Sequence, residues 1–482
     1  MCRIKQILTI FIISVMLFSC GNNVENREMN EYVSAFLNEN PSITLFGKVD
    51  VSTLLDDADY KTVPKFGEVI HSVKKDLVQM INEKSAVYYA VEGPFNEEGP
   101  AAVYGFVDVT KSSDLEQKLT KYGFDFEKSG DFSYTVNGDM CIGISKDLAV
   151  FISRPNEYVA EDELSKAFDK CKGDLSEGKV NDILAQKGDV VLGMSIASLY
   201  ATSNTELSNL SEEKQNKLKE LVNDSYTQTT FQFEDGEAII ETKNLFSTTL
   251  KEKMFFKSDK EASILSKLGQ GEAKFGLSTN LDINKLESFI NEYSPNGIND
   301  LTDLLGGPAS LAMMYGGKKP LSGLLNGDLA VVGVGEINGD GTMIPQFNFY
   351  IGLGKNGKMV AEQFSGFLSN GTMTTKLDSK GISGYSSTLY APMIGKKILL
   401  PDGAVNFGKK GITAFVNFEG LNVESFDLEG AGNVVKIIKY ISFEMDENGS
   451  RICVKAKKGG ENILKQSMDF FFKELEGKVG AI

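Results

Sequence analysis

Short apolar, β-rich runs separated by loops of Gly, Asn and Asp recur along the chain. Two such runs enclose a loop within 86–108, and a similar pair encloses a loop within 329–353. A strand-like run, a turn carrying Asp-Gly or Asn-Gly, and a second run also occur twice, at 229–243 and 440–455. These four stretches predict β-hairpins, and hairpins imply mostly antiparallel sheet.

A shorter pattern marks the ends of four β-like runs. It consists of an apolar residue, then Asp, Ser or Asn, a second apolar residue, and a leucine three positions later. The four instances are Val49-Asp50-Val51 with Leu54, Met194-Ser195-Ile196 with Leu199, Leu281-Asp282-Ile283 with Leu286, and Val416-Asn417-Phe418 with Leu421. Such side chains accept hydrogen bonds from the unpaired amides of a starting helix. We therefore expect each polar residue to cap a helix or to end its strand with a turn.

These elements fall in the same order twice, which predicts two similar halves. Helical periodicity adds helices at 206–222 and 461–475. The fold class is therefore α+β, with each half a mainly antiparallel sheet carrying packed helices. The predicted organisation is a signal peptide at 1–19, a lipidated cysteine and tether at 20–39, a first repeat at 40–255, a connector at 256–270 and a second repeat at 271–482.

The first residues predict export and lipidation. Arg3 and Lys5 precede an uncharged apolar run, Ile7 to Phe18, which is shorter than the roughly 20 residues that span a bilayer. The run ends in Leu17-Phe18-Ser19-Cys20-Gly21, which resembles the lipobox of bacterial lipoproteins. The Cys20 thiol would take a diacylglyceryl group, and cleavage before Cys20 would then free an amine for a fatty acid such as palmitate. An ordinary secretory signal is the alternative.

The lipobox, the duplication and the strand–polar–helix signatures together resemble an uncharacterised family of exported bacterial lipoproteins with a duplicated α+β body. The resemblance covers most of the chain after Cys20 and implies the same fold. It supplies no catalytic motif, so it implies no activity and no site residue beyond the lipidated cysteine.

Composition limits the function classes further. The 482 residues carry a net charge of −16, which becomes −18 (48 basic against 66 acidic) once the signal peptide is removed. This charge disfavours nucleic acid, or an anionic lipid surface, as a partner over a broad area. The single histidine, His71, excludes a multi-histidine metal site in one chain. The four arginines and the absence of tryptophan disfavour phosphate clamps and sugar-stacking platforms.

Three cysteines remain after Cys20, namely Cys141, Cys171 and Cys453. An odd number is no disulfide framework, although Cys141 and Cys171 could pair. Aligning Gly236 with Gly449 places Ile240 opposite Cys453. We therefore expect Cys453 to be a small core residue.

The sharpest motif is a glycine fingerprint at Gly352, Gly354 and Gly357, with Asp378 about 20 residues further on, as in dinucleotide-binding proteins. The first repeat has Phe106, Asp108 and Lys111 at the corresponding places, so the fold does not need the glycines. The strand also belongs to a hairpin and not to a parallel unit. We therefore expect no cofactor here.

Two weaker candidates have ordinary explanations. Glu336 and the segment Asn338-Gly339-Asp340-Gly341-Thr342 resemble part of a calcium loop, but a hairpin turn explains the same residues, so no metal is expected. His71, beside Ser72, lies in helix-like sequence without a nucleophile elbow, so no catalytic residue is assigned.

The sequence favours a membrane-anchored, non-enzymatic binding or scaffold protein of the cell envelope. Its partner would be an envelope protein, a peptide or a glycan. The anchor would lie in the cell membrane or the outer membrane, facing the periplasm or the cell surface. The alternative is a hydrolase that uses two carboxylates, for example on glycans. A deep cleft with facing carboxylates would favour the enzyme, and an apolar patch or groove would favour binding.

Overall fold

The computed structural model describes residues 28–479, with gaps at 64–66, 69, 73–79, 83–84, 97–98, 156, 175–177, 203–209, 258–263, 295–318, 335–345, 369–372 and 420–435. The chain forms two compact units. The first unit contains the chain up to Thr205, Val222–Asp235 and Glu461–Ile482; the second contains Glu206–Leu221 and Gly236–Gly460. The predicted signal peptide and Cys20 lie outside the described residues.

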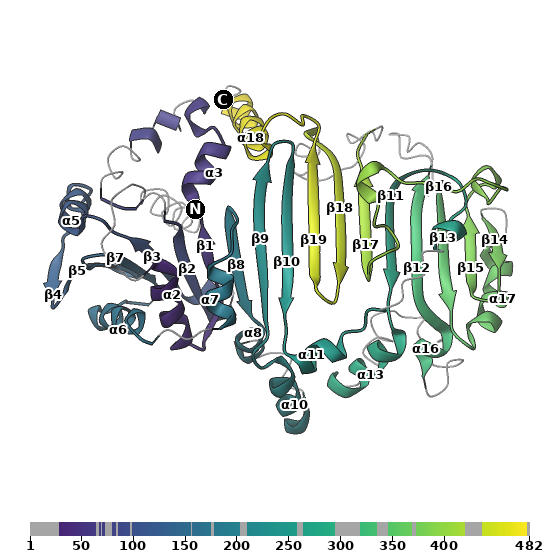
Figure 1. Ribbon diagram of the computed structural model, residues 1–482, viewed down its shortest axis with the longest axis horizontal. Helices are drawn as coiled ribbons and strands as arrows, with labels where there is room; N and C mark the ends of the chain where they lie inside the picture. The colour runs from purple at the N-terminus through teal and green to yellow at the C-terminus, as the bar shows by residue number, and fades with distance from the viewer. Residues whose placement is uncertain are drawn as a thin grey trace. The chain divides into compact units, whose positions relative to one another are not determined.

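The first unit is built on an antiparallel sheet with the strand order β9-β8-β1-β2-β3-β7-β6 (Figure 1). Its strands are β1 (Ile43–Val49), β2 (Val87–Asn96), β3 (Gly99–Asp108), β6 (Met140–Ile144), β7 (Leu148–Ser153), β8 (Val190–Ser195) and β9 (Tyr226–Glu234). Two further strands, β5 (Phe132–Asn137) and β4 (Glu127–Ser129), continue the sheet beyond β6. The predicted hairpin within 86–108 is the β2–β3 pair.

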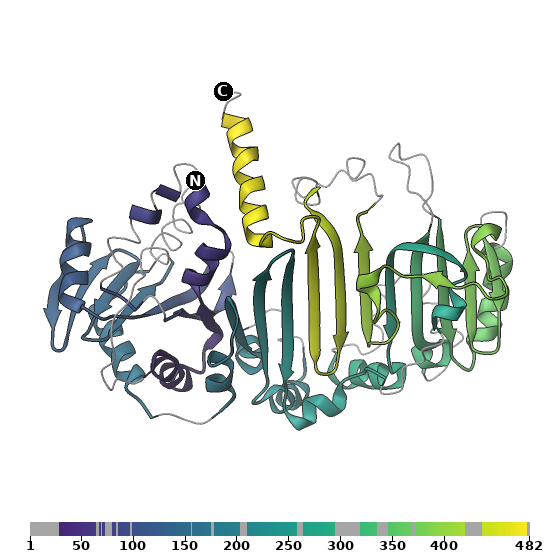
Figure 2. The same ribbon diagram turned by 45° about the horizontal axis from the view of Figure 1, so that its top comes forward.

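Helices pack on both faces of this sheet. On one face, α2 (Met29–Asn38) and α6 (Glu161–Cys171) contact the central strands, and α7 (Lys179–Leu184) contacts β1 and β8. The Phe36 ring of α2 lies 4.9 Å from Tyr104 and 5.0 Å from Phe106, measured between ring centroids. The other face carries α3 (Val51–Asp57), α5 (Ser112–Lys121) and α18 (Ile463–Val479). Figure 2 shows α18 beside α3, which it contacts.

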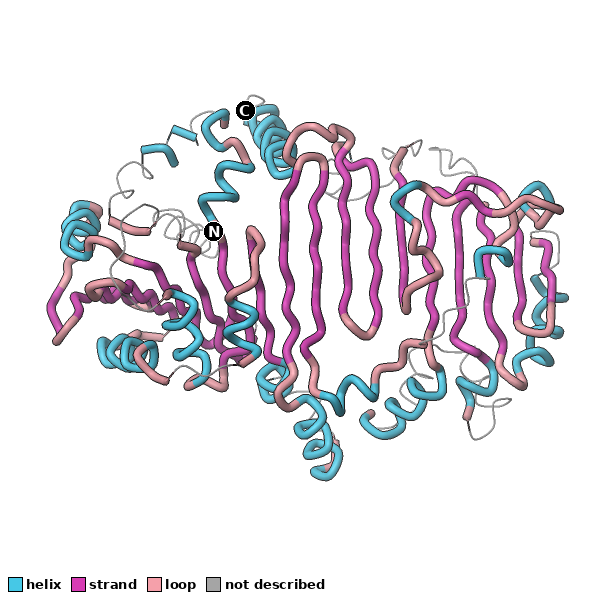
Figure 3. Tube along the Cα trace, in the orientation of Figure 1, coloured by secondary structure: helices cyan, strands magenta, loops and turns pink. Residues whose placement is uncertain are grey.

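The second unit has a sheet of its own, with the order β10-β19-β18-β17-β11-β12-β13-β15-β14, antiparallel at each pairing. Its strands are β10 (Glu237–Leu245), β11 (Gly271–Asn280), β12 (Leu325–Val334), β13 (Phe347–Leu353), β14 (Thr374–Leu377), β15 (Gly381–Tyr385), β17 (Ile412–Asn417), β18 (Ile438–Asp446) and β19 (Gly449–Ala456). The short helices α11 (Thr248–Lys253), α13 (Ile283–Tyr293) and α16 (Pro320–Leu324) gather at one end of these strands (Figure 3).

The α+β class predicted from the sequence is confirmed. The two units also share a strand order. If β1 of the first unit is matched with β11 of the second, and each later strand with its counterpart, the order β9-β8-β1-β2-β3-β7-β6 corresponds to β18-β17-β11-β12-β13-β15-β14. The predicted hairpins β2–β3 and β12–β13 occupy corresponding places in this order. This order supports the predicted repeat, although the superposition of two copies stays a prediction.

The boundaries of the two compact units differ from those predicted for the two halves. Helix α18 packs in the first unit although it follows all of the second in sequence, and the segment 236–255 belongs to the second unit. The boundary falls between Asp235 and Gly236, inside the predicted hairpin at 229–243. The predicted connector contains α12 (Ile264–Lys267), whose Ile264 joins the buried core of the second unit.

The predicted capping residues are found at the ends of their strands. Asp50 follows β1 and accepts a hydrogen bond from the Thr53 amide at 2.9 Å, and so caps α3. Asp282 accepts one from the Lys285 amide at 3.1 Å and caps α13. At the corresponding places Ser195 Oγ accepts from the Ser198 amide and Asn417 Oδ1 from the Glu419 amide. The sequence pattern therefore marks side chains that accept hydrogen bonds from nearby backbone amides, and it does not mark a binding site.

Candidate functional site

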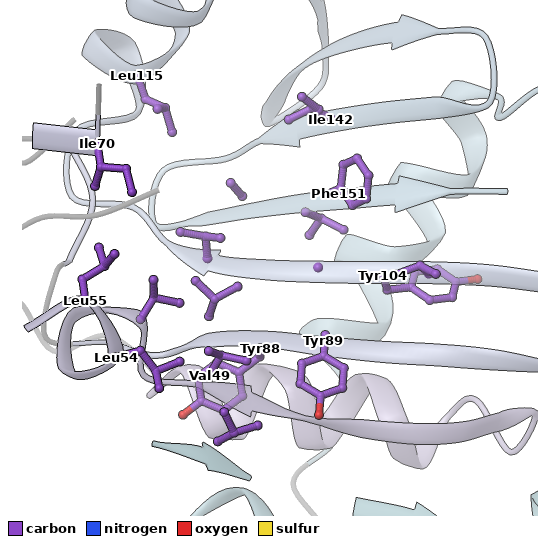
Figure 4. A pocket seen from close by; sticks show the side chains of 18 of the residues that line it. Val49, Leu54, Leu55, Ile70, Tyr88, Tyr89, Tyr104, Leu115, Ile142 and Phe151 are labelled. Carbon is purple, nitrogen blue, oxygen red and sulfur yellow. The ribbon is translucent and has the colours of Figure 1, made fainter. Parts of the chain in front are cut away.

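The first unit encloses an apolar cavity of about 620 Å³ between its sheet and the helices α3, α5 and α18. Figure 4 shows side chains from the sheet and from the facing helices converging on this space. A volume of this size is within the range of small-molecule sites in proteins, roughly 300–1,000 Å³. The cavity is therefore the leading candidate site in the described part of the chain.

The floor of the cavity consists of side chains from alternate positions of the sheet. Val87 and Tyr89 of β2 contribute, as do Val103, Gly105 and Val107 of β3, and Ala149 and Phe151 of β7. Register explains the grouping, because Tyr89 pairs with Gly105 and Gly105 pairs with Phe151. Directly paired residues of antiparallel strands point to the same face.

The two faces of this sheet differ in how well they are packed. On the face covered by α2 and α6, Ala90, Phe106 and Val150 are fully buried. On the cavity face, Val87, Val103 and Phe151 are only half-buried although they are large and apolar. Protein interiors are normally close-packed. The cavity face therefore offers apolar surface that its own helices leave uncovered.

The roof of the cavity comes from segments far apart in the sequence. Leu54 and Leu55 of α3 and Ile70 lie over one part of it, and Leu115 and Leu119 of α5 over another (Figure 4). Phe233 of β9 and two residues of α18, Leu464 and Met468, complete the lining. Because α18 follows the entire second unit, the sequence alone could not place it here.

Two tyrosine hydroxyls next to the cavity donate hydrogen bonds to other groups of the protein. The Tyr89 hydroxyl donates to the Val191 carbonyl at 3.4 Å, and burial raises the pKa of Tyr89 to about 12. The Tyr104 hydroxyl donates to Glu92 at 3.0 Å, on the other side of the sheet. None of the described lining residues carries a charge. The cavity therefore has the chemistry to hold hydrocarbon and none to hold a buried ion.

Carboxylates gather at the α3 edge of the cavity. Asp57 ends α3, and burial, followed by repulsion from Asp189, Asp56, Asp235 and Asp50, raises its pKa to about 6. Asp189 accepts a hydrogen bond from the Phe233 amide at 2.6 Å, and Phe233 lines the cavity. This edge is therefore negative, in contrast to the uncharged interior.

A second, polar pocket of about 330 Å³ lies on the opposite face of the sheet, beside α2 and α6. Its centre is Arg154, whose Nε donates to Glu163 at 2.7 Å and whose Nη2 lies 3.6 Å from Glu92. Ser42 also donates to Glu92, at 2.8 Å. Both carboxylates are engaged by one guanidinium, so this pocket contains an ion-pair network instead of a separate acid and base.

The glycine fingerprint is a packing feature. A Cβ added to Gly354 or Gly357 would lie 2.5 Å from the Ser322 carbonyl oxygen or 2.1 Å from that of Leu324, both in α16. The two glycines thus allow the backbone of α16 to pack against this segment, and this backbone occupies the space that a bound phosphate would need. Asp378 accepts hydrogen bonds from the amides of Lys380 and Gly381 and pairs with Lys267, so it holds the β14–β15 turn.

The remaining sequence candidates are not brought together into a site. The His71 side chain is exposed, in the same helical segment as the buried Ile70. Glu336 and the calcium-like segment 338–342 lie outside the described residues. Among the described residues, no cluster of three or more His, Cys, Asp or Glu side chains could hold a metal ion. In the same part of the chain, no helix combines the length and the apolar character needed to cross a bilayer.

The thiols behave as core residues. Cys141 and Cys171 are buried and are not joined by a disulfide. Burial raises the pKa of the Cys141 thiol to about 12. Cys453 of β19 is also buried, and burial raises its pKa above the ordinary value. Because the thiolate is the reactive form, none of the three has the environment of a catalytic cysteine.

Comparison with known proteins adds little. No protein family model matches the chain, and no curated protein matches it. Two solved structures, crystal forms III and I of TP0453, are each 10% identical in sequence, with TM-scores of 0.29 and 0.28. They cover 45% and 46% of this chain, and 83% and 81% of the TP0453 chain. Structural similarity with TM-scores this low supports no argument about function.

Proposed function

We propose that the protein is a membrane-anchored, non-enzymatic binding protein of the cell envelope, and that its first unit holds an apolar small molecule such as a long acyl chain. The observation that carries the proposal is the cavity of about 620 Å³ with an uncharged, almost entirely carbon lining. The lipobox at Cys20 supports the envelope location and the anchor.

The energetics suit a hydrocarbon ligand. Each methylene removed from water contributes about 0.8 kcal/mol, so twelve methylenes would contribute roughly 10 kcal/mol. Association costs an estimated 4–15 kcal/mol in lost freedom and ordering. A long chain can therefore bind with useful affinity, whereas a short one cannot. A charged head group would have to stay outside, because no described lining residue could pair with it.

The alternative is a carboxylate-dependent hydrolase, for which the polar pocket offers Glu92 and Glu163. Both side chains are engaged by Arg154. A glycosidase instead needs one carboxyl group placed as an acid and another as a nucleophile or base. The binding hypothesis therefore accounts for more of the described geometry.

Gly105 offers a direct test. It lies in the cavity floor, and an added Cβ would meet only the side chain of Phe151, at an ordinary contact distance of 3.6 Å. The substitution Gly105→Leu should therefore fill part of the cavity without displacing the sheet. Gly178 is the matched control, because an added Cβ there would meet no atom within 4 Å.

The measurement is titration of the chain from Gly21 onward with cis-parinaric acid, a fatty acid whose fluorescence rises in apolar surroundings. We expect saturable binding by the wild type and by Gly178→Leu. Binding should be weaker by roughly 200-fold in Gly105→Leu, because the new side chain displaces about four ligand methylenes at about 0.8 kcal/mol each. Equal binding by all three proteins, or no binding by the wild type, would refute the proposal.

A further inference from the structure

One segment of the second unit exposes apolar side chains that do not pack into the core of the sheet. It runs through η2 (Thr388–Tyr390) and a tight turn to β16 (Ile398–Leu399). Ile394 at the turn is fully exposed, at 105% of its reference area, and Leu389 is 67% exposed. Met393 and Leu399 are exposed as well. We call Leu389–Leu399 the apolar loop.

The base of the apolar loop is fixed to the core of its unit. The Gln270 amide donates to the Tyr390 carbonyl at 2.9 Å, and Gln270 Nε2 donates to the Leu389 carbonyl at 2.6 Å. Ile398 is buried and pairs with Gly271 of β11. The exposed tip is thus held outward by a structured base, and the exposure is a property of the fold.

The turn itself is also specified. The Lys396 amide donates to the Met393 carbonyl at 3.1 Å, and Gly395 has a positive φ of 74°. Other residues adopt this conformation only with strain, so the glycine permits a tight turn that presents Ile394 at its tip. The Met393 sulfur instead accepts a hydrogen bond from Gln270 Nε2 at 3.0 Å.

Two exposed lysines, Lys396 and Lys397, follow the tip directly. They stand out in a chain whose net charge is −16. Of the nearby acids, Glu272 pairs with Lys274 at 2.8 Å, and Asp402 lies exposed at the start of η3 (Asp402–Ala404). Apolar side chains beside lysines fit the boundary between acyl chains and anionic head groups, because the aliphatic lysine stems reach the head-group level.

We propose that the apolar loop docks on an anionic phospholipid surface, with Ile394 entering the interface and Lys396 and Lys397 meeting the head groups. The net negative charge of the chain disfavours contact with an anionic lipid surface over a broad area, but the apolar loop would make only a local contact. The lipid anchor predicted at Cys20 would keep the chain at a membrane, and the apolar loop would add a second, reversible contact there.

The test is sedimentation of the unlipidated chain from Gly21 onward with vesicles of phosphatidylcholine containing phosphatidylglycerol. We expect Ile394→Ser to weaken partitioning on the order of tenfold, from lost apolar burial. We expect Lys396→Ser and Lys397→Ser each to weaken it roughly fivefold, and added salt to reduce the effect of the lysines. Tyr158→Ser, at an exposed position of the first unit, is the control and should sediment as the wild type does.

Two results would overturn the inference. The wild type could fail to sediment with anionic vesicles, or the loop variants could sediment as well as Tyr158→Ser. Either result would leave a protein partner as the use of the loop. Because the probe is a vesicle and the variants leave the cavity intact, failure here is separate from failure of acyl-chain binding.

Discussion

Asp57 couples the stability of the cavity roof to pH. It ends α3, whose leucines cover the cavity, and its pKa is raised to about 6. The first cause is burial, and the further causes are four neighbouring aspartates. The substitution Asp57→Asn keeps the shape of the side chain and removes the charge. It should therefore stabilise the first unit at neutral pH.

The magnitude follows from linkage. The ordinary pKa of an aspartate is 3.8, and the pKa of Asp57 in the folded protein is about 6. Because one pKa unit corresponds to about 1.36 kcal/mol, this difference would destabilise the folded protein by at most about 3 kcal/mol when Asp57 is ionised. Asp57 is partly exposed, and screening by solvent reduces the effect to about 1 kcal/mol. Since the folded pKa is the higher one, stability is fully present below about pH 4 and is lost as the pH rises through about 6.

The assay is urea unfolding followed by circular dichroism at about pH 4 and about pH 7.5. Asp57→Asn should be more stable than the wild type at the higher pH, and the difference should vanish at the lower pH and shrink in high salt. Asp131→Asn, in the exposed β4–β5 turn, is the control. A gain of the same size at both pH values would show that the side-chain amide, and not the lost charge, is responsible, and would refute the reasoning.

Three other predictions concern caps, thiols and the anchor. Asp50→Ala and Asp282→Ala should each lower the free energy of unfolding by about 0.5–2 kcal/mol and leave acyl-chain binding unchanged, as measured by urea unfolding and fluorescence titration; a loss of binding without a loss of stability would contradict capping. Cys453→Ala should cost about 1 kcal/mol as a small truncation in the core, and rapid labelling of Cys453 by a bulky thiol reagent in the folded protein would contradict its burial. Cys20→Ala should leave the precursor uncleaved and without radiolabelled fatty acid, whereas normal acylation of this variant would rule out lipidation at Cys20.

Local features of the fold could be predicted from the sequence because their causes are local. Asp50 and Asp282 cap helices because amides at a helix start need acceptors, whatever the rest of the chain does. The hairpins at 86–108 and 329–353 follow from apolar runs around short loops. The sequence argues against a cofactor at the glycine fingerprint, because the corresponding positions of the predicted first repeat lack glycine. The close approach of α16 supplies the physical reason for the glycines.

The cavity could not be predicted, because the sequence pattern is the same for a filled face and for an uncovered one. Val87, Val103 and Phe151 are typical of an ordinary core strand. Whether facing side chains fill the space above them depends on α3, α5 and α18, and the last of these comes from the far end of the sequence. The negative edge has the same origin, since Asp57, Asp189 and Asp235 meet only in the folded chain.

The split of the first unit around the second constrains the order in which the protein can be completed. Helix α18 is translated after all of the second unit, yet its Leu464 and Met468 form part of the cavity wall. During vectorial synthesis, the early strands can pair while the apolar cavity still lacks this wall. Uncovered apolar surface of this kind favours association with other chains or with chaperones. Helix α18 therefore covers apolar surface of the first unit that stays exposed until the second unit has been synthesised.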